Sequence, residues 1–108
     1  MSLLRRRRNR PDEVGLADPS IVPIADAPAR RKVKVSGEVT RMRARPTSGL
    51  PALAVTISDD TGTAVAVWTG RRSIGGVALG RGLVIEGVAI RRGEQLEFTN
   101  PGYTLLKR

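Results

Sequence analysis

The chain has 108 residues, which is enough for one small domain. Hydrophobic residues make up 40% of it, but Trp68, Phe98 and Tyr103 are the only aromatic ones, so the core must consist mainly of small aliphatic side chains. The sequence contains no cysteine and no histidine, which excludes disulfides, Cys/His zinc sites and Ser-His or Cys-His catalytic pairs within this chain. We therefore expect neither an enzyme nor a cofactor.

The net charge of +9, from 19 basic and 10 acidic residues, favours a polyanionic partner. Residues 1–22 contain five arginines and three acids, which leaves 14 basic and 7 acidic residues, a net charge of +7, for residues 23–108. The candidate domain is thus basic in its own right.

Residues 1–22 combine the basic run RRRRNR at 5–10 with two prolines and no hydrophobic period, which predicts a flexible basic arm. No apolar stretch follows this run and no membrane-length apolar segment occurs in the chain, so we expect no export signal, no membrane partner and a cytoplasmic location. We expect the domain to span residues 23–108 and ordered structure to begin near Arg31.

Strand-like alternation begins at residue 32. Residues 32–45 alternate until the pattern shifts after Gly37 and Val39, which predicts a bulge or bend near Gly37. Residues 52–58 form a second expected strand and residues 63–69 a third, apolar on both faces. Residues 70–82 contain five glycines and predict a loop.

Residues 83–92 predict a fourth strand, with a second shift in alternation after Gly87, and residues 95–100 a fifth. Glycine in two long strands suits a small barrel whose strands bend at its corners. The pattern therefore predicts an all-β fold, a five-stranded barrel.

The stretch SDDTGT at 58–63 contains Asp60-Thr61-Gly62, the triplet of a homodimeric aspartic protease. Only seventeen residues separate Gly62 from Gly80, too few for the flap of such an enzyme, and Asp60 follows a polar pair. A hairpin turn at residues 59–62 is the better interpretation, and the protease remains a remote alternative. Asp59 and Asp60 have no nearby acidic helpers, so we expect no metal site.

Basic residues form three clusters in the predicted domain, and a basic surface of this kind favours phosphate contacts. With so few aromatic residues, Trp68 and Phe98 are expected in the core, which leaves Tyr103 as the candidate for base stacking. The candidate nucleic-acid-binding residues are Arg41, Arg43, Arg45, Val65, Val67, Arg71, Arg72, Arg91, Arg92 and Tyr103.

The segments VKVSGEV, VTISDDTGTAVAVW, GRRSIGGVALGRGLVIEG and NPGY, in this order, resemble the small OB-fold nucleic-acid-binding proteins of actinobacteria. More distantly, they are similar to tRNA-anticodon-type OB folds and the wedge domain of RecG-like helicases. The resemblance implies a Greek-key barrel over residues 22–106, with Ala64, Ala66 and Trp68 inside and Val65 and Val67 on the outer face.

We therefore expect an OB-fold that binds single-stranded or structured DNA or RNA with low sequence specificity. The alternative hypothesis is a protein-interaction module of the same fold, because the fold alone does not determine the ligand.

Overall fold

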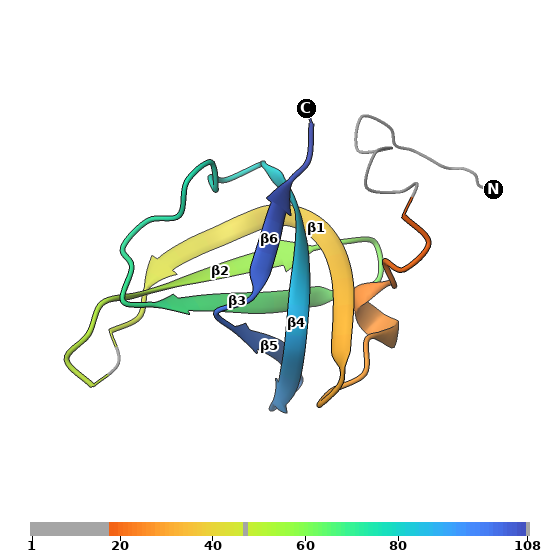
Figure 1. Ribbon diagram of the computed structural model, residues 1–108, viewed down its shortest axis with the longest axis horizontal. Helices are drawn as coiled ribbons and strands as arrows, with labels where there is room; N and C mark the ends of the chain where they lie inside the picture. The colour runs from red at the N-terminus through yellow and green to blue at the C-terminus, as the bar shows by residue number, and fades with distance from the viewer. Residues whose placement is uncertain (1–17, 47, 108) are drawn as a thin grey trace.

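The computed structural model describes residues 18–46 and 48–107 (Figure 1). Its elements are the 3-10 helix η1 (Ile24–Asp26) and the strands β1 (Lys32–Ala44), β2 (Ala52–Ser58), β3 (Thr63–Thr69), β4 (Gly82–Arg92), β5 (Gln95–Thr99) and β6 (Gly102–Leu105). No helix in these residues is long and apolar enough to cross a membrane. The expected bounds of β2 and β3 are confirmed, whereas β6 was not predicted. Residues 5–10 of the expected arm lie outside the described residues.

The strands form one sheet in the order β1-β2-β3-β5-β4-β6, and a further pairing of β1 with β4 closes the first five into a barrel. β3 and β5 are parallel, and all other neighbours are antiparallel. The predicted all-β, five-stranded barrel is therefore confirmed. β6 extends the path of β5 along β4, after an interruption at Asn100 and Pro101.

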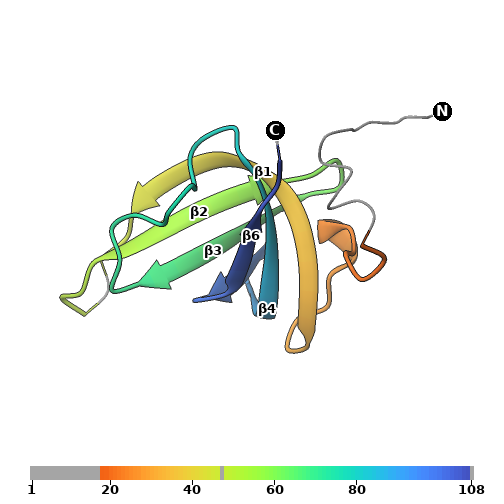
Figure 2. The same ribbon diagram turned by 45° about the horizontal axis from the view of Figure 1, so that its top comes forward.

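β1 bends strongly because it belongs to both sides of the barrel (Figure 2). Its first half pairs with β4 and its second half with β2, and the exchange falls at Gly37 and Glu38. A Cβ at Gly37 would lie 2.8 Å from the Ser58 carbonyl oxygen, so the close approach of β2 requires glycine here. The register shift itself lies between Val39 and Arg41, so the bulge or bend expected near Gly37 is confirmed.

β4 shows no shift in alternation, so the second predicted slip is wrong. Leu83, Ile85 and Ala89 are all fully buried, on one side of an uninterrupted alternation through Gly87. The apolar residues that suggested a slip, Val88 and Ile90, are instead 55% and 41% exposed. They lie on the outer face of the barrel.

The core is aliphatic, as composition predicts, with Phe98 and Trp68 as its large members. Ala64 and Ala66 point inward with Trp68, as expected. Segments outside the sheet also contribute, because Ile24 of η1 and Ile74 and Val77 of the glycine-rich loop are buried in the same cluster.

The expected beginning of ordered structure near Arg31 is wrong, since Asp18, Val22 and Ile24 already make contacts with the barrel. Asp18 forms an ion pair of 3.0 Å with Lys34, Val22 donates a backbone hydrogen bond to the Lys34 carbonyl, and Ile24 is 3% exposed. The prolines of this segment prevent a regular hydrophobic period in the sequence. The segment is buried through contacts with distant strands, which no local pattern shows.

Asp59–Gly62 forms the predicted turn between β2 and β3. The Oδ1 atom of Asp59 accepts hydrogen bonds from the backbone N–H groups of Thr61 and Gly62, at 2.7 and 3.0 Å. Its Oδ2 atom accepts one from the N–H of Ile24 at 2.9 Å, and Thr61 Oγ1 accepts one from Ala25. The turn thus binds η1, while Asp60 is exposed.

Candidate nucleic-acid interface

One row of side chains crosses the outer face of five strands in register. Arg41 of β1 pairs with Thr56 of β2, Thr56 with Val65 of β3, Val65 with Glu97 of β5, and Glu97 with Ile90 of β4. The strand neighbours of Thr56, Val65 and Glu97 are buried in the core. This row follows the outer face of the barrel from strand to strand, and Arg41 places a cation at its β1 end.

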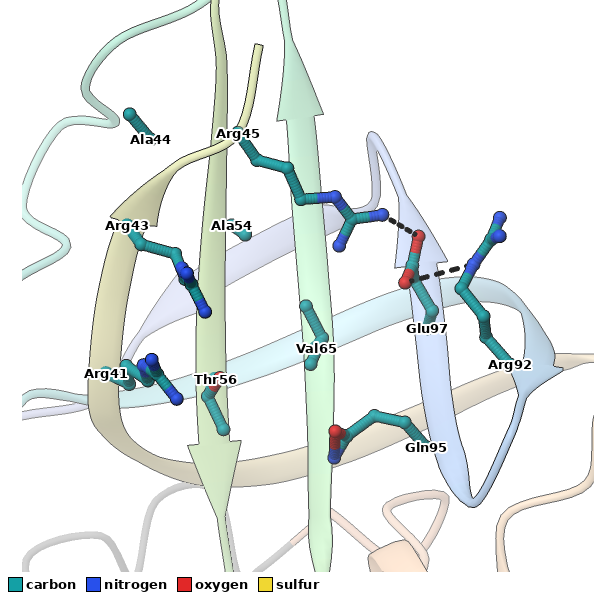
Figure 3. A pocket seen from close by; sticks show the side chains of 10 residues that line it. All are labelled: Arg41, Arg43, Ala44, Arg45, Ala54, Thr56, Val65, Arg92, Gln95 and Glu97. Carbon is teal, nitrogen blue, oxygen red and sulfur yellow. Dashed lines mark hydrogen bonds and ion pairs between the residues drawn. The ribbon is translucent and has the colours of Figure 1, made fainter. Parts of the chain in front are cut away.

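A groove of about 480 Å³ lies on this outer face (Figure 3). Its floor comes from small and aliphatic residues of β2 and β3, and its sides from β1, β4 and β5. The lining residues are Arg41, Arg43, Ala44, Arg45, Ala54, Thr56, Val65, Arg92, Gln95 and Glu97. Four arginines and one glutamate give this site an excess of positive charge.

Glu97 is the only buried charged residue in the described part of the chain, with an exposed fraction of 5%. Its Oε2 atom lies 2.9 Å from Arg45 Nη2 and its Oε1 atom 3.4 Å from Arg92 Nε. Arg45 reaches across β3 to make its contact, whereas Arg92 approaches from the end of β4 (Figure 3). A buried carboxylate needs such partners, because burial without them is costly.

Arg41 and Arg43 differ from this pair. Both are exposed on β1, at the opposite side of the groove, and neither has an ion-pair partner among residues 18–46 and 48–107. Residues two apart on a strand lie about 6.8 Å apart on the same face, so the two side chains project side by side along the edge of the groove. They are available to an anionic ligand.

The structure brings five of the ten predicted site residues to this groove: Arg41, Arg43, Arg45, Val65 and Arg92. Val67 lies on the same outer face but is 4% exposed, in a small cluster with Ala52 and Ala54. Arg71 and Arg72 are exposed in the loop beyond β3, and Arg91 is exposed at the end of β4. None of these four residues lines the groove.

Tyr103 lies elsewhere, beside Trp68 under the glycine-rich loop. The two rings meet edge to face with centroids 5.7 Å apart, and the Tyr103 hydroxyl donates a hydrogen bond of 3.0 Å to the Gly75 carbonyl. Its exposed fraction is 37%, and it does not line the groove. These contacts give the ring a structural role between β6 and the loop.

Sequence reasoning missed Glu97 and Gln95 as part of the site. The alternation of Leu96 and Phe98 with Glu97 does not indicate that Glu97 is buried, because its burial depends on Arg45 and Arg92, which come from distant parts of the chain. The signal in the sequence that could have indicated this role is a single glutamate between Leu96 and Phe98 in a basic chain.

The sequence matches no protein-family model and no curated protein. Among solved structures, the fold is similar to a domain of replication protein A from Methanococcus maripaludis, with a TM-score of 0.68 and 16% sequence identity, covering 82% of this chain and 97% of that chain. It is also similar to the OB domain of a Methanosarcina mazei protein, with a TM-score of 0.63 and 12% identity, covering 84% and 87% of the two chains.

A third similar structure is RecG bound to a three-way DNA junction, with a TM-score of 0.62 and 16% identity. The match covers 78% of this chain but only 12% of RecG, so it concerns one part of that protein. Together with the strand order, these likenesses define the fold as an OB-fold. At such low identities they define the fold alone.

Proposed function

We propose that the chain is a non-enzymatic OB-fold module that binds single-stranded or structured nucleic acid, with low sequence specificity, through the arginine-lined groove. The observation that carries this proposal is the pair of exposed arginines, Arg41 and Arg43, which have no acidic partner in the described part of the chain and lie beside a floor of small side chains on the outer face of β2 and β3. This face is where OB-folds bind oligonucleotides.

The composition of the groove suggests which forces act. Arginine provides charge and a planar group for phosphate, and Val65 provides apolar surface, but no aromatic ring lines the groove. Binding is therefore mainly electrostatic and weakly selective among bases. Arg71, Arg72, Arg91 and the arginines of residues 5–10 add general attraction for the polyanion, in a protein that we place in the cytoplasm.

Several similar structures agree with this proposal, since they include a replication protein A domain and a DNA-bound RecG. The likeness to small actinobacterial OB-fold proteins remains an expectation from the sequence motifs.

Binding of a labelled oligonucleotide, followed by fluorescence anisotropy as NaCl is raised, tests the proposal. A phosphate binder loses affinity linearly in log–log coordinates, with a slope of about −0.7 for each phosphate contact to a single strand. Absence of binding at low salt would contradict the proposal and favour the alternative of a protein-interaction module.

A further inference from the structure

The four groove arginines are not equivalent, and their difference is set by Glu97. Arg45 and Arg92 both bind the buried Glu97 carboxylate, whereas Arg41 and Arg43, across β2 and β3, bind no acid in the described residues. Among the described residues, one side of the groove thus has two cations without an acidic partner, and the other side has two cations that share one carboxylate.

Both arginines that bind Glu97 stand where a loop meets the barrel. Arg45 is the residue after β1, at the start of the β1–β2 loop, and Arg92 is the last residue of β4, before the turn into β5. Glu97 lies between them on β5. The Glu97 carboxylate therefore connects the two loop ends that border the groove. Its contacts hold the guanidinium groups of Arg45 and Arg92 toward β5 and away from a ligand.

We infer that Glu97 is a positioning residue that gives the two sides of the groove different roles, an inference that rests on the proposed function. The phosphate backbone of a single strand lies along Arg41 and Arg43 at the β1 side, and the bases point across Thr56 and Val65 toward Glu97. Arg45 and Arg92 shape the far wall and make no phosphate contact of their own.

Charge and polarity along the central row agree with this orientation. From β1 to β4 the row passes from the cation Arg41 through Thr56 and Val65 to the carboxylate of Glu97 and then to the exposed Ile90. A phosphate placed near Glu97 meets that carboxylate beside arginines already engaged with it, whereas a base presents N–H donors and an apolar face there.

A matched pair of substitutions, Arg41→Gln and Arg92→Gln, tests this inference, because each removes one groove cation. The probe is a fluorescein-labelled oligothymidylate of about 15 nucleotides, within the site size of about 4–16 nucleotides for one OB-fold. Arg41→Gln should weaken binding about fivefold at low salt, the effect of one exposed charge pair, and make the salt slope shallower by about 0.7. Arg92→Gln should weaken binding less than Arg41→Gln does, and it should change the salt slope less.

Glu97→Gln provides the reciprocal test. It keeps the shape of the side chain and removes the negative charge beside Arg92, so the salt slope should steepen. Arg92→Gln made in this background should now weaken binding about as much as Arg41→Gln. Thermal unfolding monitored by circular dichroism checks that each variant folds. If Glu97→Gln does not fold, the comparison of Arg41→Gln with Arg92→Gln decides alone.

Equal losses for Arg41→Gln and Arg92→Gln in the otherwise wild-type chain would overturn this inference and leave the proposed function intact. Absence of oligothymidylate binding by the wild-type chain at low salt would overturn both.

Discussion

At the scale of single residues, the motifs that suggested an OB-fold hold the end of β3 in place. Asn100 has φ of 49°, and its Oδ1 atom accepts a hydrogen bond of 2.9 Å from the N–H of Thr69. The Trp68 indole Nε1 donates one of 3.1 Å to the Pro101 carbonyl, and Tyr103 packs on the same indole. The Asn-Pro-Gly-Tyr ending is thus explained by packing, with no ligand required.

The left-handed backbone of Asn100 leads to a prediction. Asn100→Ala should lower the free energy of unfolding by about 2–3 kcal/mol, because it removes the bonds to Thr69 and leaves a Cβ in a strained conformation. Asn100→Gly removes the same bonds without that strain and should cost about 1 kcal/mol less. Urea unfolding measures both. Equal losses would mean that backbone strain contributes nothing.

The two aspartates of the hairpin turn should differ in the same measurement. Asp59→Ala removes three hydrogen bonds from backbone N–H groups, including one of the two that join the turn to η1, and should destabilise the protein by about 2 kcal/mol. Asp60→Ala, at an exposed neighbour, should change stability by less than about 0.5 kcal/mol. A larger loss at Asp60 would show that the turn has been assigned to the wrong aspartate.

At the scale of elements, β1 determines the barrel because it pairs with β4 and then with β2. The register shift between Val39 and Arg41 brings Arg41 and Arg43 onto the outer face. Without that shift, the alternation that buries Val33, Val35 and Val39 would turn the arginines toward the core. The bulge is therefore what allows one strand to contribute to both core and groove.

Gly37→Ala should disrupt this crossing. The new Cβ would lie within 2.8 Å of a backbone oxygen that cannot move without separating β1 from β2, so we expect a loss of about 1–3 kcal/mol in urea unfolding. Ser36→Ala, one residue earlier, is the matched control, with an expected change below about 0.5 kcal/mol. A Gly37→Ala variant as stable as the control would contradict the close approach.

The segment before β1 should respond to acid. Hydrogen bonds from the Ser20 hydroxyl and backbone N–H, and then from Lys34, lower the pKa of Asp18 from 3.8 to about 2. A carboxyl with a lowered folded-state pKa adds stability above its unfolded value, near pH 3.8, and that stability is lost as the pH falls through about 2.

Thermal unfolding of the wild type and Asp18→Asn across this range measures the effect. The variant should melt lower than wild type above pH 4, and the difference should vanish near pH 2. A difference that is constant with pH would show that the Asp18 carboxylate is not the cause.

At the scale of the whole molecule, the sequence predicts most of the barrel but only half of the site. Alternation predicts β2 and β3 residue by residue because both have one consistently buried face. β6 was missed because Pro101 and Gly102 suggest a loop, and the buried segment before β1 because its partners are distant. The slip predicted at Gly87 failed because Val88 and Ile90 remain apolar on an outer face.

The site depends on pairings between strands that no local pattern contains. Arg41 and Arg43 are recognisable as one basic edge, since they lie two residues apart on one strand. Glu97, by contrast, meets Arg45 across 52 residues of sequence, so its role becomes visible only when the barrel closes. The basic charge of the chain was therefore predictable, but its arrangement around one buried carboxylate was not.

The central claim, that the outer groove is the nucleic-acid-binding face, is tested most directly by NMR. Amide chemical shifts of the isotope-labelled chain are followed as oligothymidylate is added at low salt. We predict that the largest changes map to the groove, at Arg41, Arg43, Thr56, Val65 and Glu97, and that Tyr103 changes little. Unchanged groove amides, with shifts confined to β6 and the glycine-rich loop, would contradict the account.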